Sequence, residues 1–286
     1  MLSDPVAEVR IEAVKSIVKI GTQASLDPLI QATRDNDPEV QIRATDGLVN
    51  FYYPGYVEQG LSASLRRVSN FFKQTFTQGP DVVIPPYVKV RPEVIEALGK
   101  LARGGVNMTV RANAAHAIGI LRGQAALPDL YEALRSKDDV VMYESLYAIQ
   151  KIRDPSAAPH IAYLLRDLDE KVQIAAIETT GLLRNQEALP ELRRVLADPR
   201  SKKVARAALT AIAMIPNQEN HSLFLKYLED RDEHMRAAAA EGLARLKNAE
   251  DMATLDKAFN GEQKMPARLA RSEERRVGKE CRSRWS

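Results

Sequence analysis

The stretch DLDEKVQIAAIETTGLLRNQEALPELRRVL, residues 167–196, predicts two helices joined by a short turn. Its first half carries apolar or small residues at offsets of four, four and three, which lie on one face of a helix: Val172, Ala176, Thr180 and Leu183. The Asp-Leu-Asp that precedes them is typical of a helix start, because Asp accepts hydrogen bonds from the free amides there. The segment ALPELRRVL, residues 188–196, predicts a second, shorter helix with a proline in its first turn. We therefore expect a helical hairpin, made of a helix A and a helix B.

The same pattern recurs along the chain, so the hairpin is a repeat. Successive matches are 31 or 32 residues apart, with one exception of 70 residues, and they begin at Val9, Val40, Val110, Val141, Val172, Val204 and Met235. One hairpin cannot bury its apolar faces alone, so the hairpins must stack. The sequence therefore predicts an all-α fold, a right-handed α-solenoid of about seven hairpins over residues 1–270.

The hairpin also resembles a known family. Its D-P-x-V-x-x-x-A start, as in Asp37-Pro38-Glu39-Val40 with Ala44, is similar to a HEAT repeat of the short type found in phycobilisome-lyase-like proteins. The resemblance covers residues 3–260 apart from one insertion. It implies a scaffold, an adaptor, a chromophore lyase or, in a few members, another enzyme, because a fold does not fix a function.

The step of 70 residues marks an insertion at about residues 52–91, inside the second repeat. The window 51–92 holds eight of the chain's 16 Phe, Trp and Tyr residues. An apolar stripe predicts an amphipathic helix over residues 60–77, and the Pro-rich, β-branched residues 81–90 are expected to be extended. Two interpretations remain open: the helix covers repeats one to three as a satellite core, or the aromatic side chains form or cover a groove for a partner. Contact with a membrane surface is less favoured, since this helix carries only three positive charges.

The sequence contains no recognisable catalytic motif. None of the four histidines is followed by Glu, whereas the HEAT-repeat deoxyhypusine hydroxylases bind iron through His-Glu dyads. Glycine-rich phosphate-binding motifs and nucleophile elbows are absent from the sequence. The carboxylate pairs Glu39/Asp46 and Asp138/Asp139 are interpreted as helix caps and turns. We expect no catalytic residue, no cofactor and no metal site.

The B helices carry a ladder of arginines at equivalent positions, Arg34, Arg135 and Arg166, beside a second ladder with Tyr163 and Arg194. Because the repeat region has no net charge, these arginines are expected to pair with Glu and Asp of neighbouring repeats, and nucleic-acid binding is not favoured. We therefore predict a non-catalytic scaffold or adaptor that binds a protein partner through the concave helix-B face and the aromatic insertion. The alternative is a lyase-like enzyme or a chromophore- or ligand-binding accessory protein. The candidate partner-binding residues are Tyr53, Tyr56, Phe72, Phe76, Tyr87, Arg135, Tyr163, Arg166 and Arg194.

Composition and the two ends of the chain set the remaining limits. The 286 residues include no run of 18 apolar residues, so soluble domains are expected and a membrane-spanning helix is not. Residues 271–286, RSEERRVGKECRSRWS, contain the only Cys, the only Trp, and six basic against three acidic residues. This stretch resembles a translated sequencing adapter, and we expect it to be a non-native, disordered tail. The first repeat begins directly after Met1 without a capping repeat, which leaves open an upstream repeat or an export signal, and hence the cytoplasm or the periplasm.

Overall fold

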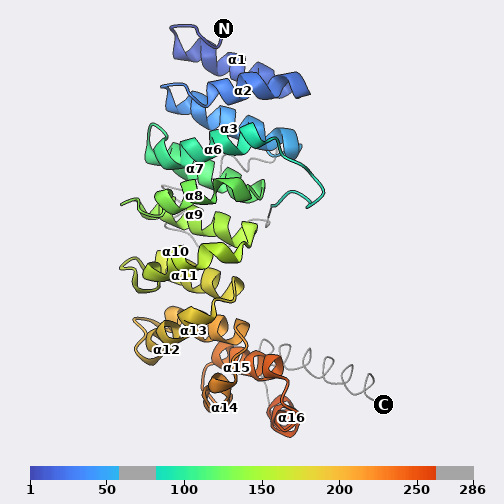
Figure 1. The fold of residues 1–286 in the computed structure, drawn as a ribbon, viewed down its shortest axis with the longest axis vertical. Coiled ribbons are helices and arrows are strands. Elements are labelled where there is room, and N and C mark those ends of the chain that lie inside the picture. Colours follow the sequence, from blue (N-terminus) through green and yellow to red (C-terminus); the bar gives the residue numbers. More distant parts are fainter. Residues whose placement is uncertain (58–81, 262–286) are drawn as a thin grey trace. The chain divides into compact units, whose positions relative to one another are not determined.

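A computed structural model describes residues 1–57 and 82–261 of the chain. The helix expected over residues 60–77, with Phe72 and Phe76, and the tail 271–286 lie outside the described residues. Contacts divide the chain into two units, Met1–Ala157 and Ala158–Ser286, and each unit is described by itself. In both units the described residues form helices joined by turns and short connections (Figure 1).

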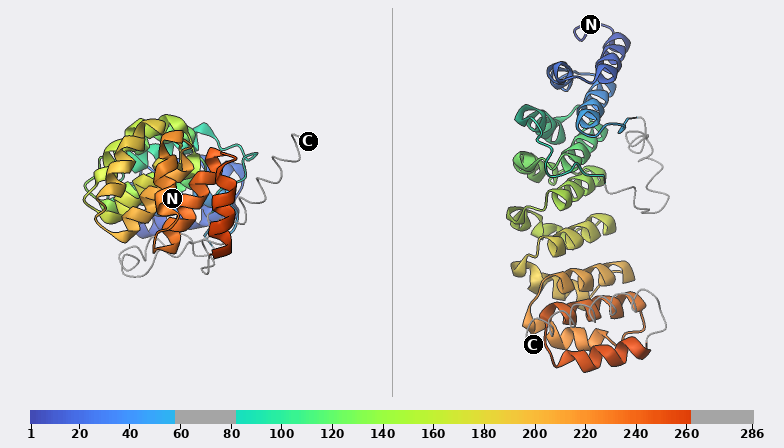
Figure 2. Two further views of the ribbon diagram at one scale, coloured as in Figure 1. Left: turned by 90° about the horizontal axis from the view of Figure 1, so that it is seen from below. Right: turned by 90° about the vertical axis from the view of Figure 1, so that its right-hand side faces the viewer.

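The first unit alternates A and B helices, as the repeat predicts. The A helices are α1 (Ala7–Ile20), α3 (Pro38–Tyr52), α7 (Met108–Ile120) and α9 (Asp139–Ile152), and the B helices are α2 (Leu26–Ala32), α6 (Pro92–Gly104) and α8 (Leu127–Ala133). The A helices pack side by side in chain order, α1 on α3, α3 on α7 and α7 on α9 (Figures 1 and 2). This order confirms a stack of hairpins, with helix B of the second repeat starting at Pro92 as expected.

The second unit has the same organisation. It begins with α10 (Ala158–Ile161) and a 3-10 turn, Ala162–Arg166, which stand where helix B of the fourth repeat is expected. The following A helices are α11 (Glu170–Leu182), α13 (Lys202–Met214) and α15 (Glu233–Leu246), and the B helices are α12 (Leu189–Ala197), α14 (His221–Tyr227) and α16 (Asp251–Gly261). Helix α11 packs on α13, and α13 packs on α15, so the hairpins of this unit are stacked too.

The repeated positions of helix A form the core of each unit. The valine that opens the pattern is completely buried in five helices: Val40, Val110, Val141, Val172 and Val204. Glycines let neighbouring A helices approach closely. A Cβ added at Gly119 would lie 2.9 Å from the Cα of Ala148, and one at Gly181 would lie 2.8 Å from the Cα of Ala211. Each of these two glycines therefore keeps its helix close to the next A helix.

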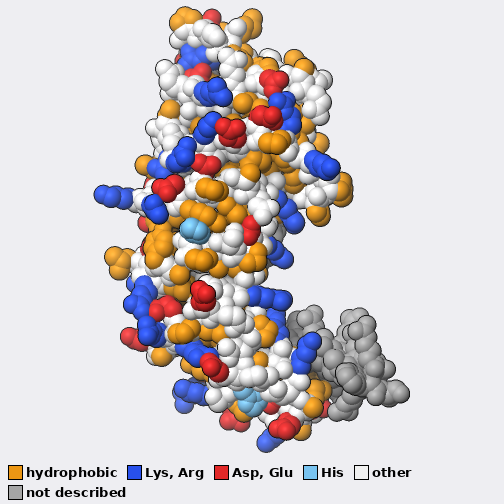
Figure 3. Space-filling view, in the orientation of Figure 1, with side chains coloured by type: hydrophobic (Ala, Val, Ile, Leu, Met, Phe, Trp, Pro, Cys, Tyr) orange, Lys and Arg blue, Asp and Glu red, His pale blue; other side chains and the backbone are white. Residues whose placement is uncertain are grey.

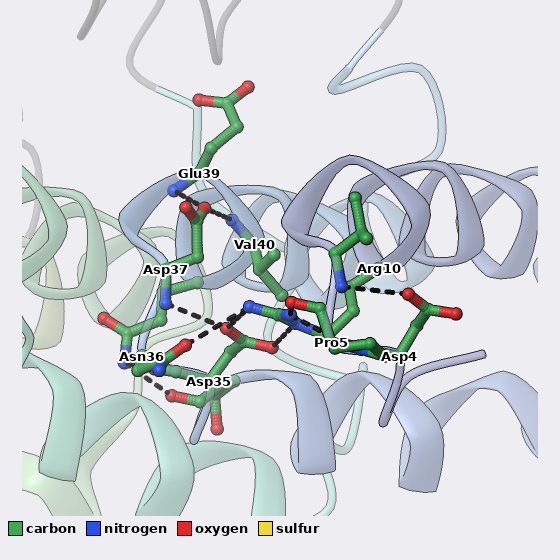
Figure 4. Close-up of polar contacts among 11 residues, drawn as sticks. Asp4, Pro5, Arg10, Asp35, Asn36, Asp37, Glu39 and Val40 are labelled. Carbon is green, nitrogen blue, oxygen red and sulfur yellow. Dashed lines mark hydrogen bonds and ion pairs between the residues drawn. The ribbon is translucent and has the colours of Figure 1, made fainter.

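A polar clasp joins the first repeat to the second. Asp37 caps α3 by accepting hydrogen bonds from two backbone amides at the start of the helix, at 2.9 and 3.1 Å. Two residues earlier, Asp35 accepts hydrogen bonds from Nε and Nη2 of Arg10 at 2.7 and 2.9 Å (Figure 4). Arg10 also donates to the backbone carbonyl of Asp4 at 2.7 Å. The guanidinium of Arg10 therefore ties the beginning of α1 to the loop before α3.

Residues 82–91 return from the insertion to α6 as a strap that contains no helix, as the sequence predicts for 81–90. Three hydrogen bonds fix the strap: Lys151 Nζ to the carbonyl of Val82 at 3.2 Å, the amide of Ile84 to the carbonyl of Ile120 at 3.0 Å, and the amide of Arg91 to Oη of Tyr52 at 3.1 Å. The side chains of Val82 and Ile84 are buried. The strap therefore lies against the carboxyl-terminal parts of α7 and α9.

Candidate functional site

An open pocket of about 470 Å³ lies between α2 and α6, the B helices of the first two repeats. Ile30 of α2 and Ala97 and Leu101 of α6 supply its apolar wall. Side chains of both charges alternate on the surface over these two helices (Figure 3). At the end of α6, a Cβ added to Gly104 would meet no described atom within 4 Å. The pocket thus combines an apolar wall, a charged rim and unfilled space.

Most of the charged groups at the rim neutralise one another. Arg91, the last residue of the strap, donates to Asp27 of α2 at 2.7 Å and to Glu93 at 3.4 Å. Lys100 donates to Glu96, one turn earlier in α6, at 2.5 Å. The pairing of Arg91 with Asp27 places the end of the strap beside the first repeat, so the insertion helps to shape this pocket.

Arg34 is the exception. Its side chain is exposed and lines the pocket, and it makes no hydrogen bond or ion pair with any residue that the structure describes. The hydrogen bond from Lys100 lowers the pKa of Glu96, and the positive charge of Arg34 adds to this effect. Glu96 is therefore ionised at neutral pH, and the positive charge of Arg34 remains available to a further acidic group.

A second cluster of charges lies on the B-helix side of the second unit. Arg166 donates through Nη2 to Oε2 of Glu191 in α12 at 2.6 Å, and its Nε donates to the other carboxylate oxygen. Arg194 donates to the same carboxylate at 3.3 Å. The hydrogen bond from Arg166 is the main cause that lowers the pKa of Glu191, and burial opposes it only partly. The expected pairing of arginines with acidic residues of a neighbouring repeat is confirmed for Arg166.

The other two B-helix candidates are exposed. Arg135, in the first unit, pairs at 3.0 Å with Glu132 of its own helical turn rather than across repeats. Tyr163, in the second unit, has 56% of its surface exposed. Arg166 and Arg194 thus converge on one carboxylate in the second unit, whereas Arg135 lies in the first unit.

The aromatic candidates of the insertion differ in accessibility. Tyr53, just after α3, is half-buried, and Tyr56 is 1% exposed, which leaves its ring no surface for a partner. Tyr87 is 81% exposed and stands in a turn that is closed by a hydrogen bond from the amide of Val88 to the carbonyl of Pro85 at 3.0 Å. Of the insertion's candidates that the structure describes, Tyr87 is therefore the one that offers a free ring.

A polar cluster among the A helices was not anticipated. Asp46, in the middle of α3, is buried and accepts a hydrogen bond from Nδ2 of Asn113 in α7 at 3.2 Å. His116 of α7 is 2.9 Å from a carboxylate oxygen of Glu144 in α9. Burial raises the pKa of Tyr56, and the negative charges of Asp46 and Glu144 raise it further. The interpretation of Asp46 as a cap or turn residue was wrong, because its carboxylate joins two neighbouring A helices.

The burial of α7, which carries Asn113 and His116, has a signal in its sequence. Its 13 residues, MTVRANAAHAIGI, have no continuous polar face, and nine of them are buried. A helix without a continuous polar face is buried on most sides, so the segments around α7 must cover most of its surface. The strap supplies part of this cover.

The described residues contain no cluster of three or more His, Cys, Asp or Glu able to hold a metal ion. Within the same ranges, every helix is too short or too polar to cross a membrane.

These observations define an α-solenoid protein: its two-helix repeats stack in chain order, and Asp residues cap its A helices. The chain belongs to the HEAT-repeat family, since the family model for HEAT repeats matches residues 1–61, 95–167 and 199–272. No curated protein matches the chain significantly.

Three solved structures are similar to this chain, and the first two share its fold. The Escherichia coli protein YibA has 14% identity and a TM-score of 0.57, with 96% of this chain and 89% of that chain covered. An engineered protein has 17% identity and a TM-score of 0.52, with 78% and 96% covered. The CpcE–CpcF complex of phycocyanin lyase from Nostoc sp. has 16% identity and a TM-score of 0.47, with 90% and 96% covered.

Proposed function

We propose that this chain is a non-catalytic interaction scaffold that binds a protein partner through the surfaces of its B helices. The observation that carries the proposal is the pocket between α2 and α6. It has an apolar wall and contains Arg34, whose side chain makes no ion pair with a described residue. Repeat proteins of this class use the continuous surface of one helix layer to bind extended partners. A mixed apolar and charged surface is what such a contact requires.

Exposed side chains of the kind that carry binding energy support the same interpretation. Tyr163 and Arg194 are exposed in the second unit, and Tyr87 is exposed in the first. Tyr and Arg are enriched among the residues that contribute most to protein interfaces. The strap holds Tyr87 in a closed turn, so its backbone position is fixed before a partner binds and less entropy is lost on association.

Site-specific photo-crosslinking tests the proposal. A benzoylphenylalanine placed at Tyr163 or at Tyr87, in the full chain expressed in its source organism, is expected to give discrete protein adducts that mass spectrometry identifies. The matched control carries the same photo-reactive residue at Lys203, an exposed position on helix A of the sixth repeat. Adducts that are equally abundant at Lys203, or an absence of adducts at both tyrosines, would contradict the proposed helix-B and strap surface.

A further inference from the structure

The charged side chains around the pocket between α2 and α6 are three acidic and three basic, but they are not paired one to one. Arg91 is shared by Asp27 and Glu93, and Lys100 is paired with Glu96. Arg34 lines the same pocket, and its side chain makes no hydrogen bond or ion pair with a described residue, although its charge acts on Glu96. A guanidinium presents several N–H donors in a planar fork that matches the two oxygens of a carboxylate. The guanidinium of Arg34 can therefore donate hydrogen bonds to one carboxylate from outside.

The other residues of the lining restrict the kind of ligand that can carry this carboxylate. The carboxylates of Asp27, Glu93 and Glu96 stand around the pocket and repel a ligand with many negative charges. Nucleic acids need clustered cations to neutralise successive phosphates, and a single unpaired arginine does not provide them. The apolar wall of Ile30, Ala97 and Leu101 suits an aliphatic or aromatic side chain next to the carboxylate.

We propose that this pocket binds a partner protein through one Asp or Glu side chain that pairs with Arg34, while a neighbouring apolar side chain packs against Ile30 and Leu101. This inference rests on the proposed scaffold function and names the chemistry that its first unit recognises. The partner segment carries an isolated acidic residue rather than an acidic run, because Glu93 and Glu96 flank the binding position.

Two pairs of variants isolate the pocket. Arg34→Gln removes the unpaired cation, and Arg231→Gln is its control, since Arg231 is also an exposed arginine in a loop that precedes an A helix and has no side-chain partner among the described residues. Gly104→Trp places a bulky side chain in the lining of the pocket, and Gly261→Trp is its control. Both glycines end a helix, and an added Cβ meets no described atom within 4 Å at either one. Circular dichroism checks that all four variants keep the helical content of the parent chain.

The experiment selects a phage-displayed library of random dodecapeptides on the full chain and then measures binding of the selected peptides by fluorescence anisotropy. We expect enrichment of one Asp or Glu beside an apolar residue. Replacing that residue by Asn or Gln, introducing Arg34→Gln, or introducing Gly104→Trp is each expected to weaken binding by about tenfold or more, as the loss of a charge-assisted hydrogen bond does. The two control variants are expected to bind like the parent. Arg34→Glu is expected to select peptides with Lys or Arg at the same position.

The other outcomes separate the two proposals. Selected peptides that lack a common carboxylate, or whose binding is unchanged by Arg34→Gln, overturn the inference about the pocket and leave the scaffold function standing. A library from which nothing is selected, together with an absence of crosslinked partners, contradicts both. Binding of a labelled oligothymidylate that Arg34→Gln abolishes overturns the inference in favour of a nucleic-acid ligand.

Discussion

Arg10 and Asp35 form a two-pronged ion pair between the first and second repeats, with Nε to Oδ2 at 2.7 Å and Nη2 to Oδ1 at 2.9 Å. Only 11% of the Arg10 side chain and 10% of the Asp35 side chain are exposed. Burial tends to raise the pKa of Asp35, but the hydrogen bonds from Arg10 and from backbone amides outweigh it and lower the pKa. The pair therefore stabilises the stack only while Asp35 is ionised.

Replacing Asp35 by Asn tests this contribution. Because its pKa is lowered in the folded state, Asp35 stabilises the fold above its unfolded pKa of about 3.9 and loses the effect as the pH falls through the folded pKa. We expect Asp35→Asn to lower the free energy of unfolding by about 1 kcal/mol near neutral pH and by less at about pH 3. Urea unfolding followed by circular dichroism at both pH values measures the difference. The control is Asp27→Asn, whose side chain is 74% exposed; an equal loss there would contradict a specific role of the clasp.

Close packing of the A helices predicts that a Gly→Ala substitution has the opposite of its usual effect on stability. Alanine normally stabilises a helix relative to glycine. At Gly119, however, the added Cβ would lie 2.9 Å from the Cα of Ala148, so α7 and α9 must move apart. We expect Gly119→Ala to destabilise the chain by about 1–3 kcal/mol. Gly104→Ala, in open space at the end of α6, is expected to be neutral or slightly stabilising in the same thermal unfolding assay. Equal melting temperatures for the two variants would refute the packing argument.

The repeats could be predicted from the sequence because their cause is local. The Val and Ala positions of helix A, the capping Asp and the proline of helix B all lie within one period, and the structure buries Val172 and Ala176 as that pattern requires. The resumption of helix B at Pro92 followed from the same period.

The charged pairs could not be predicted in the same way. Arg91 pairs with Asp27 across 64 residues, and this contact depends on where the strap re-enters the stack. Asn113 reaches Asp46 across 67 residues because of the register between α3 and α7, which no single-helix pattern encodes. Arg34 was visible as one step of a ladder, but its lack of a partner became evident only when the neighbouring charges were placed.

The buried ring of Tyr56 leads to a prediction for alkaline pH. Burial, with smaller contributions from Asp46 and Glu144, raises the pKa of its phenol above the ordinary value of about 10. The neutral phenol is favoured in the folded state, so its stabilising effect is complete below the unfolded pKa and is lost as the pH rises towards the folded pKa. We expect Tyr56→Phe to unfold at a similar urea concentration to the parent at about pH 8 but to resist alkaline destabilisation better at about pH 10.5. Tyr87→Phe is the control, because Tyr87 is 81% exposed, and a matching gain for Tyr87→Phe would contradict the assignment.

The strap provides the last prediction, which concerns local stability rather than global unfolding. The amide of Ile84 donates to the carbonyl of Ile120, and Lys151 Nζ donates to the carbonyl of Val82 while lying 4.6 Å from the ring centre of Tyr147. We expect the amide of Ile84 to be protected from hydrogen exchange in the parent chain and to exchange about tenfold faster in Lys151→Met, because the carbonyl of Val82 loses a donor.

Exchange followed by mass spectrometry on peptides covering residues 82–91 measures the effect of Lys151→Met. Lys137→Met, at an exposed loop position, is the control and is expected to leave these peptides unchanged. Faster exchange throughout α9 as well as in the strap would show that Lys151 supports the helix stack as a whole. In that case the strap would not be an independently anchored element, and the backbone position of Tyr87 would need another cause.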